Sequence, residues 1–249
     1  MKNSLLLSAA VSLFLFSCSV NQQIYLSPDG SGHVESSVLL EDFFITTLQD
    51  LTDLSNSGQG GGNRLDSGSI KAELEQNPFF TDIKVESPRD GKYSGSLSFH
   101  HIEELFLSTG KLTGVPAENR VLEYKALSQD THQLKIRINK DNFQQLFQLF
   151  PMLQDPGFQY FLPEPSISEA EYKEMLFFIF EDARGIEEKT LRSLINSASL
   201  NLLITVEGRI IEQKGGQMFN TSTMKISLPL IKLLLHKEDI NYSLTYKSR

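Results

Sequence analysis

The chain has 249 residues with one cysteine and no tryptophan, and its 23 basic and 31 acidic side chains give a net charge of −8. A single thiol excludes a disulfide framework and a cysteine-rich zinc module, and the acidic balance argues against a nucleic-acid partner, which would require clustered Lys and Arg. With 40% hydrophobic residues, the composition is that of a folded protein and not of a disordered chain.

Residues 1–17 have the layout of a secretory signal peptide. Lys2 supplies a positive charge, and the run Leu5–Phe16 is apolar, broken only by serines and alanines. About twelve apolar residues are too few to cross a bilayer of about 30 Å as a permanent helix. We therefore expect residues 1–17 to be removed, which leaves a mature chain of residues 18–249.

The apolar run ends in Leu15, Phe16, Ser17 and Cys18. This segment resembles the lipobox of bacterial lipoproteins, and Phe16 makes it similar to the looser lipobox of spirochaete lipoproteins. The alternative is an ordinary signal with a chance cysteine near its end. The resemblance implies that Cys18 carries a diacylglyceryl thioether and an amide-linked acyl chain, and two or more chains anchor a protein stably to a membrane.

The mature chain alternates strand and helix patterns. Alternation of apolar and polar residues predicts antiparallel hairpins, the first of which turns at Pro28 and Gly30. The predicted hairpins span 22–40, 81–99 and 121–138, and further strands span 199–206, 217–226 and 240–247. Helical spacing of apolar residues predicts helices over 41–54, 141–149, 168–182 and 191–198. These elements predict an α+β fold, in which antiparallel hairpins form a sheet packed against several amphipathic helices.

Two helix-flanking features refine this prediction. Ser168, with Glu171 three residues later, has the pattern of a capping box. The apolar run Met175–Phe180 indicates a helix sandwiched between the proline-rich segment 150–165 and a sheet. Residues 55–69 contain five glycines, four serines and two asparagines, which predicts a flexible loop. We place this loop inside one domain, residues 18–249, because the segment before it is too short for a core of its own.

Phenylalanines and prolines crowd the middle of the chain. Eight phenylalanines fall within residues 143–180, and four of the nine prolines fall within 151–165. Prolines keep segment 150–165 from forming regular helix or strand, so its apolar side chains must pack on the core, contact a partner or line a pocket. The side chains predicted to contact a ligand or partner are Phe150, Phe158, Tyr160, Phe161 and Leu162.

No motif for catalysis or for a cofactor is present. The chain lacks a P-loop, a GxGxxG fingerprint and a GxSxG elbow. The best metal candidate, His100–Glu104, does not have the spacing of a metalloprotease helix and has no second cluster to complete it, so we interpret it as a polar junction between a strand and a short helix. We expect no enzyme, no metal and no cofactor, although Ser, His and Asp can form a triad from any order in a sequence.

Two blocks at opposite ends of the mature chain carry a family resemblance. The first is Cys18 leading into a strand, the turn Ser-Pro-Asp-Gly-Ser-Gly at 27–32 and a second strand. The second is Ile-Thr-Val-Glu-Gly-Arg-Ile at 204–210, followed by a Gly-Gly pair and another strand. Together they resemble the LppM-like lipoprotein family of bacteria, which more usually has Pro at the position of Glu207. The resemblance implies a lipid-anchored α+β envelope domain without catalytic residues to carry over.

Two functions follow from these patterns. The first is a membrane-tethered, non-catalytic binding or structural module of the bacterial cell envelope, on its periplasmic or surface face, with an envelope protein as a possible partner. The alternative is a carrier or sensor of a hydrophobic, lipid-like ligand that uses the aromatic region 143–180, since ligand sites are concave and largely apolar. No nucleic acid is expected as a partner of either.

Overall fold

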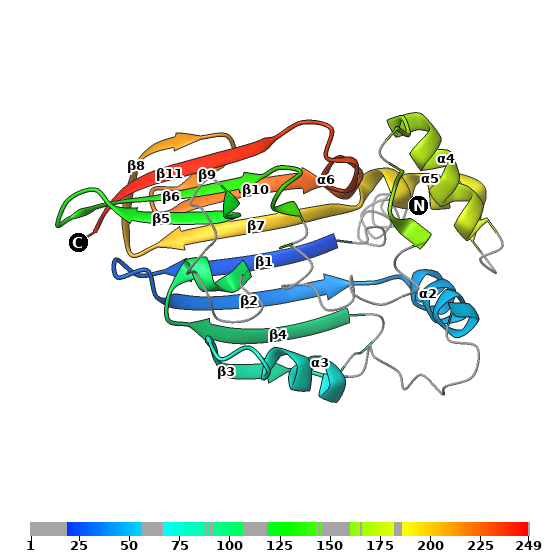
Figure 1. Ribbon diagram of the computed structural model, residues 1–249, viewed down its shortest axis with the longest axis horizontal. Coiled ribbons are helices and arrows are strands. Elements are labelled where there is room, and N and C mark those ends of the chain that lie inside the picture. Colours follow the sequence, from blue (N-terminus) through cyan, green and yellow to red (C-terminus); the bar gives the residue numbers. More distant parts are fainter. Residues whose placement is uncertain are drawn as a thin grey trace, which may run out of the picture.

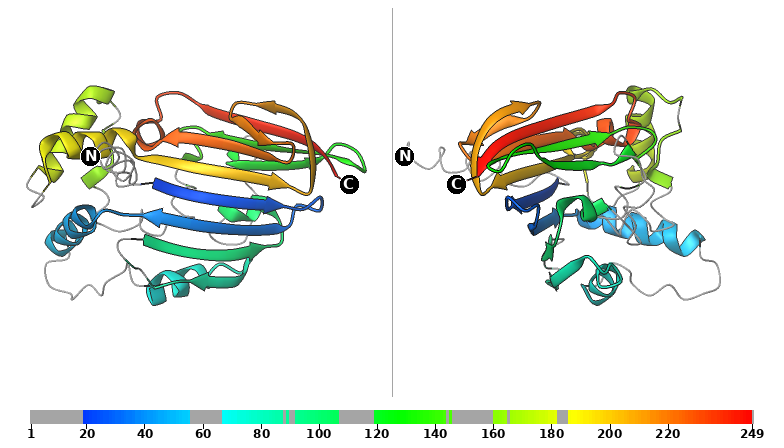
Figure 2. Two further views of the ribbon diagram at one scale, coloured as in Figure 1. Left: turned by 180° about the vertical axis from the view of Figure 1, so that it is seen from behind. Right: turned by 60° about the vertical axis from the view of Figure 1, so that its left-hand side comes forward.

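The computed structural model describes residues 19–55, 67–87, 89, 92–106, 119–143, 145, 160–164, 166–181 and 186–248. Two β-sheets lie face to face, and most of the helices gather at one end of them (Figure 1). The fold is α+β, as predicted, but it contains two sheets where the sequence patterns indicated one. The smaller sheet covers the half of the larger sheet that contains β7 and β10 (Figure 2).

The larger sheet has seven strands. In spatial order they are β3 (Phe80–Val85), β4 (Lys92–Phe99), β2 (Gly32–Leu39), β1 (Ser19–Leu26), β7 (Ser199–Val206), β10 (Thr223–Pro229) and β9 (Gln217–Asn220). The two predicted hairpins, β1–β2 and β3–β4, are confirmed. At the centre β1 and β7 pair in parallel, with Gln22 opposite Leu202. This parallel pair departs from the purely antiparallel prediction, because local alternation of residues carries no information about pairing between distant strands.

The smaller sheet has four strands. They are β5 (Leu122–Ala126), β6 (Thr131–Ile138), β11 (Ile240–Ser248) and β8 (Gly208–Lys214). Strand β8 was not predicted, and the predicted strand 217–226 is divided into β9 and β10. The chain passes from β8 in one sheet to β9 in the other through Gly215 and Gly216, which both have positive φ and so accept the sharp change of direction that side chains disfavour.

The main core fills the space between the sheets. Alternate residues of each strand point inward, and those with almost no exposed surface include Ile204, Leu134, Leu244, Met224 and Ile226. Each such side chain contributes about 1.5–3 kcal/mol relative to full exposure. The period of two that predicted the strands is therefore the pattern that builds this core.

Four helices form a second core at the end of the sheets: α2 (Asp42–Ser55), α4 (Glu169–Phe180), α5 (Glu188–Ser197) and α6 (Leu230–Leu235). The helix α3 (Ser67–Leu74) and the 3₁₀ helix η1 (Ile102–Phe106) pack on the main core instead. Helices α2, α4 and α5 were predicted; α3 and α6 were not. Because α2 includes Ser55 and α3 begins at Ser67, the predicted loop 55–69 is shorter than expected, and its remaining residues lie outside the described part. The predicted helix 141–149 also lies largely outside it.

Helix α4 begins with the predicted capping box. The Ser168 hydroxyl accepts a hydrogen bond from the Glu171 backbone N–H at 3.2 Å, and the Glu171 carboxylate accepts one from the Ser168 backbone N–H at 2.8 Å. The helix packs on α5, α2 and α6, and Phe178 is 70% exposed. The prediction that α4 is sandwiched against a sheet is therefore wrong: one of its phenylalanines faces outward.

The packing of the second core predicts that truncating two of its phenylalanines to alanine will change the free energy of unfolding by very different amounts. Phe161 is 2% exposed and stacks on Phe180 at a ring distance of 5.3 Å, whereas Phe178 is 70% exposed. We expect Phe161→Ala to lower the free energy of unfolding by about 3–5 kcal/mol and Phe178→Ala to change it by less than about 0.5 kcal/mol. Urea unfolding of both variants checks this, and equal losses would show that the two side chains are not in these environments.

Candidate functional site

One face of the seven-stranded sheet is open. In Figure 2 (left) no helix or strand lies over β4, β2, β1, β7 and β10 on this side. The side chains of β1 alternate, so that Ile24 and Leu26 enter the core while Asn21 and Gln23 point to the open face. Polar side chains thus cover the open face from strand to strand, as expected for a sheet with one solvated surface.

The open face contains a hollow of about 630 Å³. Amides, hydroxyls and a few charged groups make up most of its lining, with Leu203 and Phe219 as its apolar members. The lining residues are Asn21, Gln22, Gln23, Glu35, Ser36, Ser37, Lys84, Glu86, Ser94, Gly95, Ser96, Asn201, Leu203, Phe219 and Lys225. Two carboxylates and two ammonium groups balance in charge, so the hollow suits a polar ligand without a strong net charge.

Asn201 is held in place within the hollow. Its side-chain N–H donates to the Asn21 amide oxygen at 3.2 Å, and the Ser227 hydroxyl donates to its amide oxygen at 2.7 Å. In the described part of the chain the Gln23 side chain makes no hydrogen bond, and Phe219 at the rim is 68% exposed. The hollow therefore contains the fixed amide of Asn201, the amide of Gln23, whose hydrogen-bonding groups face solvent, and the exposed ring of Phe219. Groups of these kinds bind ligands at protein surfaces.

A second, smaller pocket lies on the opposite side of the same sheet. It has a volume of about 120 Å³ and lies between α3 and strands β1–β4. Its apolar lining comes from Val34, Val38, Ile70, Leu74, Val85 and Leu97. A cavity of roughly 150 Å³ holds one benzene molecule, so this pocket has room for a small apolar group and not for a whole acyl chain.

The predicted aromatic site is not assembled as one surface. Tyr160 is 50% exposed, Leu162 is half-buried, and Phe161 lies in the helical core. The buried Tyr172 hydroxyl donates to the Phe161 carbonyl oxygen at 2.5 Å, which fixes this part of the segment. Phe150 and Phe158 lie outside the described residues, as does Cys18. Packing alone thus accounts for Phe161, and Tyr160 is the most exposed of the three described side chains.

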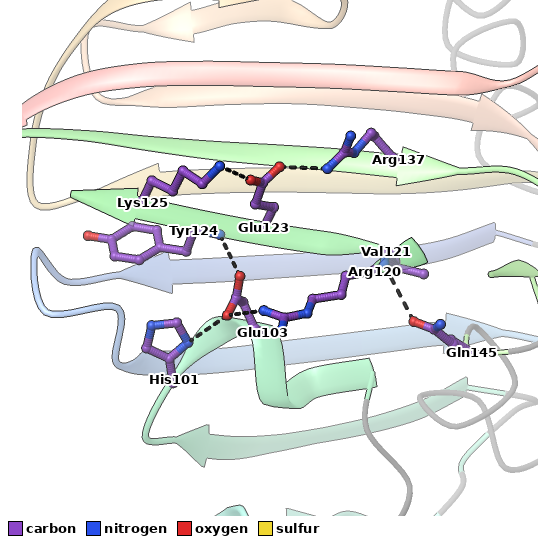
Figure 3. Close-up of polar contacts among 9 residues, drawn as sticks. All are labelled: His101, Glu103, Arg120, Val121, Glu123, Tyr124, Lys125, Arg137 and Gln145. Atoms are coloured by element: carbon purple, nitrogen blue, oxygen red, sulfur yellow. Dashed lines mark hydrogen bonds and ion pairs between the residues drawn. The ribbon is translucent and has the colours of Figure 1, made fainter. Parts of the chain in front are cut away.

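The predicted polar junction at residues 100–104 is built around Glu103 (Figure 3). Its carboxylate accepts from the Tyr124 backbone N–H at 2.9 Å and from Arg120 at 3.3 Å, and His101 Nδ1 lies 3.8 Å away. These contacts join η1 to β5. Among the described residues no three His, Cys, Asp or Glu side chains lie close enough to hold a metal ion.

A second carboxylate, Glu123, lies on the outer face of the smaller sheet (Figure 3). Its side chain contacts Lys125, lies 2.6 Å from Arg137 and 4.0 Å from Lys135, and is 5% exposed. Burial raises the pKa of Glu123, but the hydrogen bond from Lys125 and the charges of Lys135 and Arg137 outweigh burial and hold the pKa below its usual value. This carboxylate was not singled out in the sequence, because its three partners come together only when β5 and β6 pair.

Two tyrosines hold the turn that joins β1 to β2. The Tyr124 hydroxyl donates to the Pro28 carbonyl oxygen at 2.6 Å, and the Tyr246 hydroxyl lies 3.2 Å from the Ser27 carbonyl oxygen and 3.0 Å from the Tyr124 hydroxyl. Tyr246 is fully buried. The smaller sheet thereby fixes the end of the central hairpin on which the open face is built.

Comparisons with known proteins find little. No family model matches the chain, and no curated protein matches it. The chain is similar to the NMR structure of the folded domain of LppM from Mycobacterium tuberculosis, with a TM-score of 0.37 and 12% identity, covering 94% of this chain and 92% of that one. A similarity at this level does not show the LppM-like family for this chain, and it transfers no function. No helix among the described residues has the length and apolar character that a membrane span requires.

The Glu123 cluster predicts a pH-dependent contribution to stability. We expect Glu123→Gln to lower the free energy of unfolding by about 1–3 kcal/mol at pH 7, less than for a fully buried pair because the cations are partly exposed. Since the native pKa is lowered, the unfolded chain binds the proton more readily, so this stabilisation is present above the ordinary Glu pKa and is lost as the pH falls through the native one.

Urea unfolding at pH 7, 5 and 3 measures this effect. The difference between wild type and Glu123→Gln should shrink as the solution is acidified. Glu212→Gln, a change at an exposed carboxylate of the same sheet, is the control and should stay within about 0.5 kcal/mol of wild type. If the free energies of unfolding of wild type and Glu123→Gln differed by the same amount at all three pH values, the charge of Glu123 would not contribute to stability.

Proposed function

We propose that the protein is a non-catalytic binding module of the bacterial cell envelope, tethered to a membrane through a lipid on Cys18, and that it binds its partner in the hollow of the open sheet face. The observation that carries this proposal is the hollow itself, a volume of about 630 Å³ lined largely by polar residues on a sheet face that no described element covers. In concave sites a few fixed polar groups orient the ligand and provide specificity, and Asn201 is such a group in the hollow.

The position of Cys18 supports a close tether. The next residue, Ser19, is the first of β1, so a lipid on Cys18 would be joined to the central sheet without a linker. Strand β1 begins at the helical end of the molecule (Figure 1), and its eight residues rise by about 26 Å. The proposed tether would therefore hold the helical end near the bilayer and present the hollow along the side of the domain.

The second candidate function is that of a carrier or sensor of a hydrophobic ligand. It is favoured by the apolar pocket beside α3 and by the exposed side chains of Phe178 and Tyr160. The volume of about 120 Å³ limits what this pocket holds to part of a lipid. Mass spectrometry of organic extracts from the purified protein distinguishes the two functions, since a carrier would retain a stoichiometric lipid that is not attached to Cys18.

Photo-crosslinking in cells tests the binding module. We expect a photoreactive residue at Gln23, in the hollow, to give a discrete adduct, because a ligand in the hollow lies within reach of this side chain. The same residue at exposed Lys189 of α5 is the control and should give none. With Cys18→Ala in addition, the protein should leave the membrane fraction and the Gln23 adduct should weaken strongly.

Two results would contradict the proposal. Equal adducts from Gln23 and Lys189, or none from either, would exclude the hollow as the binding site. A Cys18→Ala protein that still partitions with membranes like wild type would exclude the lipid tether.

A further inference from the structure

The outer face of the four-stranded sheet carries a concentration of positive charge. Strand register places alternate side chains on this face, with Lys135 opposite both Glu123 and Ser243, and Lys247 opposite Arg209. Its basic side chains are Lys125, Lys135, Arg137, Arg209, Lys214 and Lys247. The six cations share the face with two carboxylates, Glu123 and Glu212, an excess of four positive charges in a chain whose net charge is −8.

Apart from the Glu123 cluster, the charges on this face are not arranged for stability. Arg209 and Lys247 stand directly across from each other on neighbouring strands, and like charges in this position are destabilising. Lys247 lies 3.8 Å from the exposed Asp130, while Arg209 and Lys214 form no ion pair within the described residues. One buried carboxylate, Glu123, is shared by three cations, Lys125, Lys135 and Arg137, of which Figure 3 shows Lys125 and Arg137. The excess charge is therefore left to attract an anionic partner.

We propose that this cationic face binds an acidic polysaccharide. Cations at every second residue of a strand, as at Lys135 and Arg137, are about 7 Å apart, which suits the repeated anionic groups of a linear polymer. Between them the face presents Gln133, Ser243 and Asn241, whose amides and hydroxyl can hydrogen-bond to sugar hydroxyls. The proposal concerns a different surface from the hollow and does not depend on a lipid at Cys18.

The side chains of this face disfavour the other anionic macromolecules. Surfaces that lie in the bilayer interface combine cations with apolar side chains that insert among the lipids. Here the exposed Leu127 and Ile211 lie in the β5–β6 turn and at the irregular pairing of β8, on the edge of the face. Single-stranded nucleic acids are bound by aromatic rings on which bases stack. On the outward positions of β5, β6, β8 and β11 there is no aromatic ring.

Heparin, a sulfated and carboxylated polysaccharide, is the test probe. The purified full chain, held in neutral phosphatidylcholine nanodiscs, should bind heparin with an affinity that falls as salt rises from about 50 to 200 mM, because counterions are released on binding. The triple variant Arg209→Gln, Lys214→Gln, Lys247→Gln should bind about tenfold more weakly or worse, with a shallower dependence on salt. The charge-conserving variant Arg209→Lys, Lys247→Arg should keep wild-type affinity.

The matched control removes the same charge elsewhere. The variant Lys189→Gln, Lys232→Gln, Lys237→Gln changes three exposed lysines at the helical end, and its heparin affinity should stay within about twofold of wild type because these groups are remote from the face. Equal losses in the two triple variants, or no binding of heparin by wild type, would overturn the proposal. Binding to phosphatidylglycerol vesicles or to single-stranded DNA that is as tight and is lost in the same variant would also overturn it.

Discussion

The structure depends on the parallel pairing of β1 with β7. This ladder runs over all eight residues of both strands, from Ser19 opposite Ser199 to Leu26 opposite Val206. It joins the N-terminal strands β1–β4 to the C-terminal strands β7, β10 and β9 in one sheet. Contacts between residues about 180 positions apart are slow to form because the closure of so long a loop costs entropy first. The hollow on the open face crosses this ladder, since its lining includes Asn21 and Asn201, so the proposed site exists only once the two halves have joined.

The two sheets present surfaces of different chemistry. The open face of the larger sheet is balanced in charge and carries fixed amides and hydroxyls, whereas the outer face of the smaller sheet has an excess of cations. The shared core holds these surfaces back to back, and the contacts of Tyr124 and Tyr246 with the β1–β2 turn lock them together. The two proposed sites therefore face in opposite directions, and a partner at one does not obstruct the other.

Local patterns in the sequence determine most elements but not their partners. Alternation in 131–138 and 240–247 predicts both strands correctly, and Ser168 with Glu171 predicts the start of α4, because each signal is complete within a few residues. Strand β8 was missed because Ile211, the unpaired residue at its bulge, breaks its alternation. The aromatic segment drew attention to Phe161, which is a core residue. The hollow and the Glu123 cluster consist mostly of ordinary polar residues, and only strand pairing brings them together, so no local pattern could predict either site.

Native-state hydrogen exchange tests the central claim, that the β1–β7 ladder holds the molecule together, most directly. If the account is right, the backbone amides of Ile24 in β1 and Ile204 in β7 exchange with the same free energy, equal to that of global unfolding and higher than that of residues in the edge strands β3 and β9. The contrary result would be exchange of the β1 amides at a clearly lower free energy than those of β7. That result would mean that the N-terminal strands open separately and that the central ladder does not join the two halves.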